Sequence, residues 1–380
     1  MHIAFLTPEY PHANVTAAAG IATSIKNLVD TLAETENKIS VFVYGQEKDE
    51  IIIENEVNIH LIKQQNYIAG TWYFYNKKVQ NYINKIVVQD KIDIIEAPDW
   101  TGFSGVMNFT IPLIIRFHGS DTYFCHLENR KQKFKNNFFE KLAISKATAY
   151  IAPTFFAGEL SKKLFKIKNK EIKTIHYGLQ LDKFLNPNPN DYAQGQILYI
   201  GTLIRKKGVF ELPFILKNVL SQHSNAKLIL IGSDASDLQT NSNSTWKILK
   251  EEFKNMDVTY LGKIPYHEVQ EQIKKAHVCI FPTFAETLGM VTIESMAMNK
   301  PVVNSNIGWA NELIEDSKSG YLVHPKNHTE FANKIINLLN DRNLTNSIGT
   351  EARKRVETTF DIVQIANQNL EFYKSILDKK

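Results

Sequence analysis

The segment Phe284-Ala285-Glu286-Thr287-Leu288-Gly289-Met290-Val291-Thr292-Ile293-Glu294-Ser295-Met296-Ala297 places two glutamates eight residues apart. A strand-like apolar run, Val278–Phe281, precedes it, so Glu286 falls in a loop and Glu294 in the apolar helix that follows. An unpaired buried carboxylate is costly, so Glu294 is expected to have a polar partner. The backbone N–H groups of Leu288, Gly289 and Met290 stand at the start of this helix, where anions bind well. The segment therefore offers phosphate donors flanked by two acceptors for sugar hydroxyls, unless it is simply a helix with a solvated glutamate.

The regions on both sides of this segment alternate short strand-like runs with amphipathic helical ones, which predicts parallel sheets with helical crossovers. A turn-rich stretch without an apolar pattern, residues 186–191, interrupts the alternation and is typical of a linker. We therefore expect an α/β protein with two Rossmann-like domains, residues 1–187 and 188–360. The last helix, 361–380, has no strand after it.

The composition is that of a globular protein rather than a membrane-spanning or metal-binding one. The chain has 380 residues, of which 43% are hydrophobic and 22% charged, and that length favours two domains. No apolar run approaches the roughly 18 residues of a membrane span. The two cysteines, Cys125 and Cys279, are far apart in the sequence and have no metal-ligand spacing. A cytoplasmic location fits this cysteine usage best.

Charge is unevenly distributed along the chain. Residues 130–173 contain 12 lysines and arginines against three glutamates, a net charge of +9, although the whole chain carries only +4. Phenylalanines at 134, 138 and 139 interleave with the first basic residues. This region is either a solvated helix face over the core or a surface for peripheral contact with an anionic membrane. A nucleic-acid partner is not expected, because no binding motif accompanies the charge.

Three segments of the second half resemble retaining glycosyltransferases of family 4, which have the GT-B fold of two Rossmann-like domains facing across a cleft. The Glu286–Glu294 pair resembles the family's E-x7-E element. The segment Gly201-Thr202-Leu203-Ile204-Arg205-Lys206-Lys207-Gly208 resembles its G-R-L-x-x-x-K-G element, with Thr202 in place of the arginine. The segment Val258–Pro265 resembles the strand and glycine that carry the nucleobase.

The resemblance implies roles for these residues of the second domain. Lys207, with Arg205, would stabilise the leaving nucleoside diphosphate, and cationic hydrogen bonds of this kind contribute about 1.5–3 kcal/mol each. Glu286 would hold donor-sugar hydroxyls, and Glu294 the ribose hydroxyls. The donor site would be completed by the following residues: Thr202, Lys263, Ile264, Leu288, Gly289 and Met290.

The first domain contributes three further candidates by the same resemblance. His118, in Arg116-Phe117-His118-Gly119, would contact the donor sugar as a catalytic residue. Gly20, at a helix start, would let the backbone approach the donor. Asp99 and Trp100 would shape the acceptor pocket. The terminal helix 361–380 would cross back to pack on this domain. The family's P-N-G-x-D segment appears as His176-Tyr177-Gly178-Leu179-Gln180, a departure that leaves the role of that loop open.

The resemblance implies a hexosyl transfer from a nucleotide-sugar donor to a hydroxyl acceptor, either a glycan or a lipid-linked one, with retention at the anomeric carbon. UDP is favoured as the donor nucleotide and GDP is second. No metal or other cofactor is expected, since no acidic, histidine or cysteine cluster has ligand spacing. The product is expected to be a bacterial cell-envelope or surface glycan, with the enzyme cytoplasmic or peripheral at the inner face of the membrane. Two alternatives remain, a nucleotide-sugar epimerase of the same fold and a non-catalytic nucleotide-sugar binding subunit.

Overall fold

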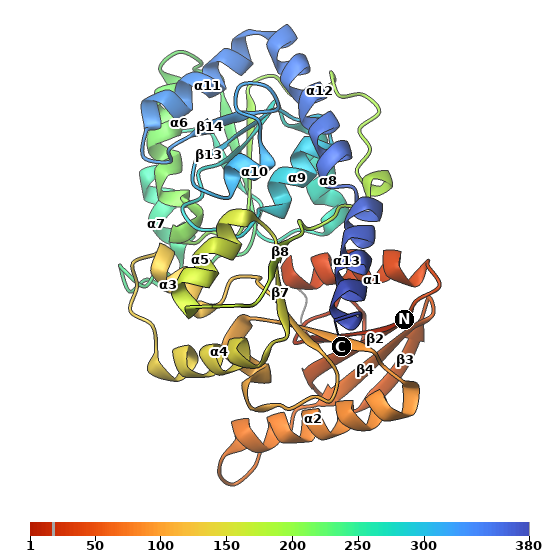
Figure 1. The fold of residues 1–380 in the computed structure, drawn as a ribbon. Helices are drawn as coiled ribbons and strands as arrows, with labels where there is room; N and C mark the ends of the chain where they lie inside the picture. The colour runs from red at the N-terminus through yellow and green to blue at the C-terminus, as the bar shows by residue number, and fades with distance from the viewer. Residues whose placement is uncertain (17–19, 380) are drawn as a thin grey trace. The chain divides into compact units, whose positions relative to one another are not determined.

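The chain forms two α/β units, each built around its own sheet (Figure 1). The computed structural model describes residues 1–16 and 20–379. The first unit comprises Met1–Leu179 and Ile362–Lys380, and the second Gln180–Asp361. The division at Leu179 precedes the turn-rich segment 186–191, where the sequence had suggested a linker.

The first unit contains an eight-stranded sheet in the order β3-β4-β2-β1-β5-β6-β7-β8. All neighbouring strands are parallel except β3 and β4, which are antiparallel. The parallel sheet expected from the sequence therefore has one antiparallel strand, β3, at its edge. The strands are β1 His2–Thr7, β2 Lys38–Gln46, β3 Glu50–Glu54, β4 Val57–Lys63, β5 Ile94–Pro98, β6 Leu113–Arg116, β7 Ala149–Ala152 and β8 Ile172–Thr174.

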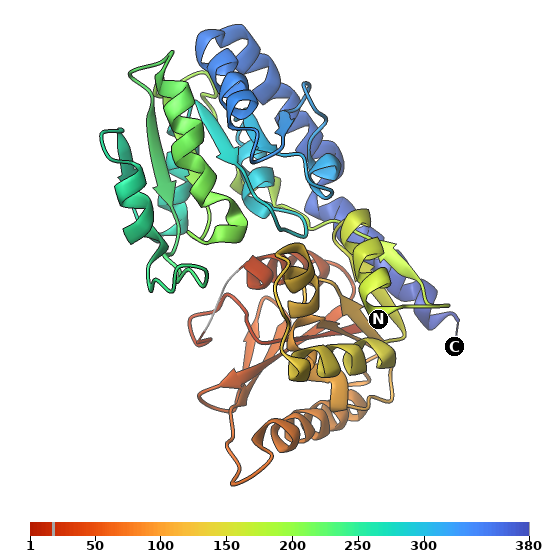
Figure 2. The same cartoon turned by 90° about the vertical axis from the view of Figure 1, so that its left-hand side faces the viewer.

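Helices cover both faces of this sheet. Alternate residues of β1 point to opposite faces, so Ile3 and Phe5 pack with α1 and α13, while Ala4 and Leu6 pack with α2. Figure 2 shows α2 on one side of the sheet and α1 on the other. The helices are α1 Gly20–Ala33, α2 Thr71–Asp90, α3 Asp121–Leu127, α4 Phe134–Lys146, α5 Phe155–Phe165 and α13 Ile362–Leu377, and a 3-10 segment, η1, spans Trp100–Val106.

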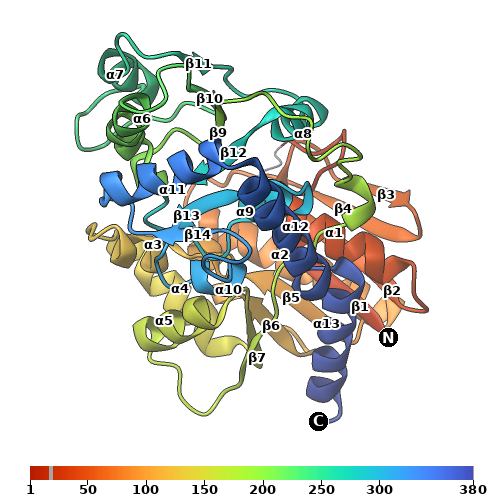
Figure 3. The same ribbon diagram turned by 90° about the horizontal axis from the view of Figure 1, so that it is seen from above.

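Helix α13 brings the end of the chain back onto the first unit, beside α1 (Figure 3). A buried polar cluster joins it to the sheet. Arg116 pairs with Glu96 through hydrogen bonds of 2.6 and 2.8 Å. From α13, Tyr373 donates to Glu96 at 2.5 Å, and Asn369 accepts from Arg116 at 2.5 Å. A buried polar group that loses its partner is destabilising, so the hydrogen bonds of Asn369 and Tyr373 to this pair fix the position of α13.

The second unit contains a six-stranded sheet, entirely parallel, in the order β11-β10-β9-β12-β13-β14. Its strands are β9 Gln196–Ile200, β10 Lys227–Ile231, β11 Val258–Tyr260, β12 Val278–Phe281, β13 Val302–Ser305 and β14 Tyr321–Val323. Its helices are α6 Leu212–Leu220, α7 Thr245–Glu252, α8 Tyr266–Lys275, α9 Met290–Ala297, α10 Ala310–Leu313, α11 His328–Asn340 and α12 Arg342–Thr359, with 3-10 turns η2 Leu181–Lys183, η3 Arg205–Lys207 and η4 Val209–Glu211.

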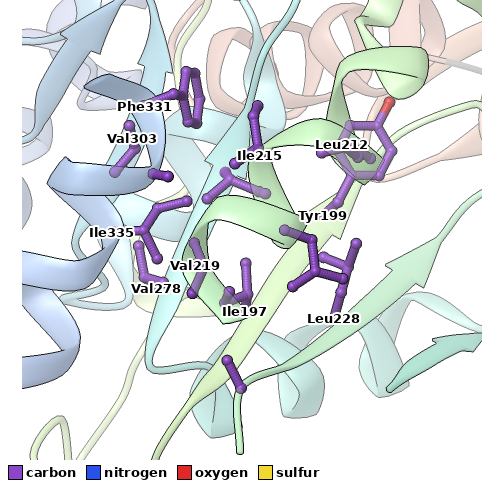
Figure 4. Packing of buried hydrophobic residues seen from close by; sticks show 14 of the residues in the cluster. Ile197, Tyr199, Leu212, Ile215, Val219, Leu228, Val278, Val303, Phe331 and Ile335 are labelled. Carbon is purple, nitrogen blue, oxygen red and sulfur yellow. The ribbon is translucent and has the colours of Figure 1, made fainter. Parts of the chain in front are cut away.

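The core of the second unit lies between its sheet and helices α6 and α11 (Figure 4). Ile197 and Tyr199 of β9 meet Ile215 and Val219 of α6 in this layer. Burial of such side chains contributes about 1.5–3 kcal/mol each. The packing fixes the carboxyl end of β9, from which the loop containing Lys207 departs. In the described part of the chain, none of the helices has both the length and the apolar character needed to cross a bilayer.

Candidate functional site

Two loops of the second unit lie against each other at the carboxyl ends of the adjacent strands β9 and β12. The backbone N–H of Phe284 donates to the carbonyl of Lys206 at 2.8 Å, and that of Ala285 donates to the same oxygen at 3.3 Å. Gly208 has a φ of +72°, and a Cβ there would collide with the carbonyl of Pro282. The left-handed conformation favours glycine, and the close approach requires it. Parallel sheets bind ligands at this edge, so the loops are well placed for a site.

The contact between the loops brings the sequence-predicted Lys207 and Glu286 together in an ion pair. Burial opposes ionisation of Glu286, but the adjacent Lys207 ammonium outweighs it and lowers the pKa of this carboxyl. The backbone N–H of Thr287 also donates to Glu286, at 3.2 Å. Glu286 is thus an ionised acceptor whose position is set by a cation 79 residues earlier in the chain.

Helix α9 starts directly after Glu286. Gly289 has a φ of +102° and lies at the N-terminal cap, so the chain turns sharply before Met290 opens the helix. Leu288 is buried, which anchors the turn from below. The first backbone N–H groups of a helix have no partner within it, and they favour anions.

Glu294 lies in the second turn of α9 and is only 5% exposed. The Tyr266 hydroxyl, at the start of α8, donates to it at 2.7 Å. Burial raises the pKa of Glu294 to about 7, and the tyrosine hydrogen bond only partly offsets this effect. The expected polar partner is therefore a neutral hydroxyl rather than a cation.

Arg205 does not join the Lys207–Glu286 pair. It makes a two-pronged contact with the buried Asp237, with hydrogen bonds of 2.9 and 2.7 Å, and its guanidinium lies over the Phe210 ring at 4.1 Å. The hydrogen bond from Arg205 lowers the pKa of Asp237 to about 2. The charge of Arg205 is thus compensated inside the unit, which the sequence did not reveal.

The remaining donor-site candidates of the second unit lie in loops near this edge. Thr202 is exposed directly after β9, and its carbonyl accepts from the Tyr199 hydroxyl at 3.3 Å. Lys263 and Ile264 lie between β11 and α8, three and two residues before Tyr266. The structure thus gathers Thr202, Lys207 and Glu286 on neighbouring loops and connects Glu294 to the segment of Lys263 and Ile264 through Tyr266.

His118 follows β6 in the first unit and is buried. Its Nδ1 lies 2.7 Å from the Tyr177 hydroxyl, and the two rings stack with centroids 5.4 Å apart. Burial, reinforced by the nearby Arg116 charge, lowers the pKa of His118 to about 3. The imidazole is consequently neutral at physiological pH and can act as a hydrogen-bonding group but not as a cation.

The two predicted acceptor residues have different environments. Asp99 is 1% exposed and accepts the backbone N–H of His118 at 2.9 Å, while burial raises its pKa to about 7. In this conformation Asp99 supports the His118 loop from within and offers no surface to a sugar. Trp100 is 37% exposed at the start of η1 and remains accessible. Gly20 begins α1, but its surroundings lie outside the described residues.

Three polar contacts were not foreseen from the sequence, those made by Tyr266, Asp237 and Tyr177. Each partner is 28 to 59 residues away from the residue that it contacts, and no spacing pattern marks such pairs. Tyr177 alone had a signal, because it occupies the asparagine position of a family segment. Among the residues that the structure describes, no group of three or more His, Cys, Asp and Glu side chains could hold a metal ion.

Comparison with known proteins shows the family of the chain. The model of the glycosyl transferases group 1 family matches residues 182–355, and that of glycosyltransferase family 4 matches residues 18–183. The glycosyltransferase MJ1607 of Methanocaldococcus jannaschii is 25% identical over 100% of this chain and 99% of its own. The capsular polysaccharide biosynthesis glycosyltransferase CapM of Staphylococcus aureus is 28% identical over 63% of this chain and 64% of its own.

The solved structures show the same fold. The Anabaena protein HepE, crystallised in complex with UDP, has a TM-score of 0.73 and 19% identity, covering 99% of this chain and 100% of its own. The two family models together span both α/β units, with their junction at residues 182–183, close to the division between the units. The chain therefore belongs to the family 4 glycosyltransferases, transferase enzymes of GT-B fold.

Proposed function

We propose that this enzyme transfers a hexosyl group from UDP-sugar to a hydroxyl acceptor, with retention at the anomeric carbon. The observation that carries the proposal is the contact between the loop of Lys207 and the loop of Glu286, directly before α9. It places a cation, an ionised hydroxyl acceptor and helix N–H groups in one short region. A departing diphosphate gains negative charge, and preorganised donors of this kind stabilise it.

In this mechanism Lys207 and the N–H groups of residues 288–290 hold the diphosphate as the sugar–phosphate bond breaks. Glu286 orients the sugar hydroxyls, and Glu294 with Tyr266 receives the ribose. The acceptor hydroxyl attacks from the face that the diphosphate leaves, and its proton passes to the departing phosphate oxygen. Neutral His118 orients the donor sugar by a hydrogen bond. Arg205 has a supporting role, since its pairing with Asp237 stiffens the loop that carries Lys207.

We propose that no divalent metal takes part, with Lys207 supplying the charge that a metal would otherwise provide. UDP is favoured because the structurally similar HepE was crystallised with it, and GDP is second. The similarity to CapM, named for capsular polysaccharide biosynthesis, supports an acceptor in a bacterial surface glycan. We place the synthesis in the cytoplasm, as the cysteine usage of the chain suggests. The basic region 130–173 would then contact the inner face of the membrane.

Calorimetric titration of UDP, GDP, ADP and dTDP, each with chelator present, tests the donor site. We expect one nucleotide to bind wild type tightly and to bind Lys207→Ala about 10- to 100-fold more weakly, as loss of a charged hydrogen bond implies. Lys247→Ala, which removes an exposed lysine on α7, is the matched control. Absence of binding by every diphosphate would refute the proposal. Turnover of the nucleotide sugar to an isomer without acceptor would instead support the epimerase.

A further inference from the structure

A large pocket lies in the first unit, outside the donor site proposed for the second unit. Its volume is about 800 Å³, and it lies where β2 and β4 end and where α2, η1 and α4 approach one another. Aromatic rings dominate its walls. They are those of Tyr44, Trp72, Tyr73, Tyr75, Phe103 and Phe139.

The walls are fixed by contacts among themselves. Tyr44 stacks on Phe103 with ring centroids 3.6 Å apart and planes 7° apart. The ring of Trp72 on α2 lies against that of Phe139 on α4, with ring centroids 3.8 Å apart. The Tyr75 hydroxyl accepts the backbone N–H of Gly45 at 2.6 Å and donates to the carbonyl of Ile62 at 3.1 Å. The rings are thus held in place and present largely apolar faces to an occupant.

Besides the tyrosine hydroxyls, the polar side chains that line the pocket are those of Thr16, Gln46, Gln64, Thr71 and Lys135. Several already have partners, since Gln64 donates to the carbonyl of Gln65 and Thr71 to that of Tyr67. Gln46 accepts both the backbone N–H and the hydroxyl of Thr16, at 3.1 and 3.0 Å, and its amide donates to the carbonyl of Tyr44 at 3.0 Å. Lys135, on α4, is the charged side chain among those that line the pocket. A sugar bound deep inside would need more partners for its hydroxyls than these walls offer, whereas an apolar group with a nearby anion fits them.

Exposed apolar side chains surround the same region. Ile68 and Phe134 are almost fully exposed, and Phe74 and Phe138 are about half exposed. Contacts between rings run from Phe134 to Phe138, from Phe138 to Phe139, and from Phe139 to Trp72. An apolar path therefore connects the surface of α4 with the wall of the pocket.

Positive charge accompanies these rings. Five exposed lysines lie in or just before α4. Two of them, Lys131 and Lys133, precede the helix, and the others are Lys135, Lys141 and Lys146 within it. Glu140, the acidic residue of this helix, is buried and accepts backbone N–H groups of Asp121 and Thr122, so it does not neutralise the surface. Exposed aromatics interleaved with lysines are typical of surfaces that lie on anionic lipid.

We propose that the pocket binds the apolar chain of an anionic, lipid-linked acceptor drawn from a membrane, with its phosphate beside Lys135. The inference rests on the proposed glycosyl transfer and names the class of its acceptor. Phe134 and Phe138 enter the lipid surface, and the aromatic walls receive the part of the chain nearest the head group. Lys135 holds the phosphate at the mouth, which leaves the acceptor hydroxyl outside the apolar walls.

Calorimetry with dodecyl phosphate, below its aggregation concentration, tests the pocket. We expect it to bind wild type, while inorganic phosphate and maltose do not. Gln64→Trp places a bulky ring at the exposed lining position after β4 and should weaken binding at least tenfold. Gln65→Trp, at the neighbouring exposed position, should not. Equal binding to both variants, or binding of maltose as tight as that of dodecyl phosphate, would overturn the proposal.

The role of the charge is tested with Lys135→Ala. This variant should bind dodecyl phosphate several-fold more weakly than wild type does, yet bind dodecyl maltoside with unchanged affinity. Lys141→Ala, on the same helix but outside the pocket lining, is its control. An equal loss for both amphiphiles in Lys135→Ala would remove the phosphate from the proposal and contradict it.

Vesicle flotation distinguishes a lipid held in a membrane from a soluble amphiphile. We expect binding to vesicles of phosphatidylglycerol but not phosphatidylcholine, and loss of binding in the double variant Phe134→Ser, Phe138→Ser. Phe214→Ser, which removes a half-exposed phenylalanine of α6, is the control. Absence of vesicle binding would overturn the membrane source. UDP binding is measured in parallel, to separate the proposed function from the proposed pocket. If wild type does not bind UDP, the proposed function is refuted. If wild type binds UDP but no amphiphile, only the pocket inference is refuted.

Discussion

At the scale of single residues, the two glutamates of the E-x7-E segment have pKa values shifted in opposite directions, although their spacing makes them look equivalent. Lys207 lowers the pKa of Glu286, whereas burial beside the neutral Tyr266 raises that of Glu294 to about 7. Two carboxyls whose environments separate their pKa values usually have separate tasks. The sequence predicted that both glutamates matter, but their partners arise from contacts far along the chain.

Glu286→Gln should change recognition of the sugar and leave recognition of the nucleotide intact. The amide keeps the shape of the side chain but loses the charge that Lys207 contacts and that a sugar hydroxyl would contact in the proposed mechanism. We expect UDP affinity within about twofold of wild type, because the diphosphate donors remain. The additional affinity of the UDP-sugar over UDP should disappear, by about 1–3 kcal/mol. Parallel titrations measure both quantities, and a UDP affinity reduced as far as in Lys207→Ala would contradict the separate roles.

In the proposed ribose site, the pKa of Glu294, about 7, should make nucleoside binding depend on pH. An ionised carboxylate accepts both ribose hydroxyls, whereas the protonated form competes as a donor, so affinity should rise with pH. Uridine is the suitable ligand because it carries no phosphate that titrates in the same range. We expect its affinity to rise up to about tenfold between roughly pH 6 and pH 8, following the ionised fraction of a group with this pKa.

Glu294→Gln is the control for this pH dependence. The amide does not titrate, so uridine affinity should become flat over the same range. A pH profile that is unchanged in Glu294→Gln would show that another group titrates and would exclude Glu294 from the ribose site.

At the scale of elements, the sequence predicted strands better than it predicted how loops meet. The alternation of β and helical patterns was sufficient for both parallel sheets, because buried parallel strands are continuous apolar runs. It missed β3, Glu50–Glu54, whose residues alternate in exposure at the antiparallel edge. The contact of the Lys207 loop with the Glu286 loop was not predictable either. It depends on the close approach of Gly208 to the carbonyl of Pro282, which is 74 residues later in the chain.

Gly208→Ala should therefore separate the two loops. Gly208 and Gly262 both have positive φ, +72° and +68°, but a Cβ at Gly262 meets nothing within 4 Å. Backbone strain alone costs about 1 kcal/mol, and we expect this small loss for Gly262→Ala. Gly208→Ala adds a collision with Pro282 and should cost several-fold more. Thermal unfolding of both variants measures the difference, and equal midpoints would show that the loops tolerate separation.

At the scale of the whole molecule, the chain returns to its first unit through α13 after completing the second. The resemblance to GT-B enzymes implied this return for the final helix, which has no strand after it. The buried cluster that holds it could not be predicted, because Arg116 bonds to Asn369, and Glu96 to Tyr373, across separations of 253 and 277 residues. The Arg116–Glu96 pair alone could form without α13, so the tyrosine and asparagine are the groups that make docking specific.

Tyr373→Phe tests this anchoring. The variant keeps the ring but removes the hydroxyl that donates to buried Glu96 at 2.5 Å, and a buried acceptor deprived of a donor costs about 1–3 kcal/mol. Lys379→Ala is the matched control, since it removes an exposed ion pair with Glu171 between the same chain end and the same unit, and exposed pairs contribute at most about 1 kcal/mol.

Scanning calorimetry with and without UDP assigns the transitions, because a ligand stabilises the unit that binds it. One transition should have a midpoint temperature that UDP does not raise. We expect that temperature to fall in Tyr373→Phe and to stay unchanged in Lys379→Ala. A fall of the UDP-sensitive transition instead would mean that α13 stabilises the second unit, and equal shifts in both variants would mean that docking rests on exposed charge rather than on the buried cluster.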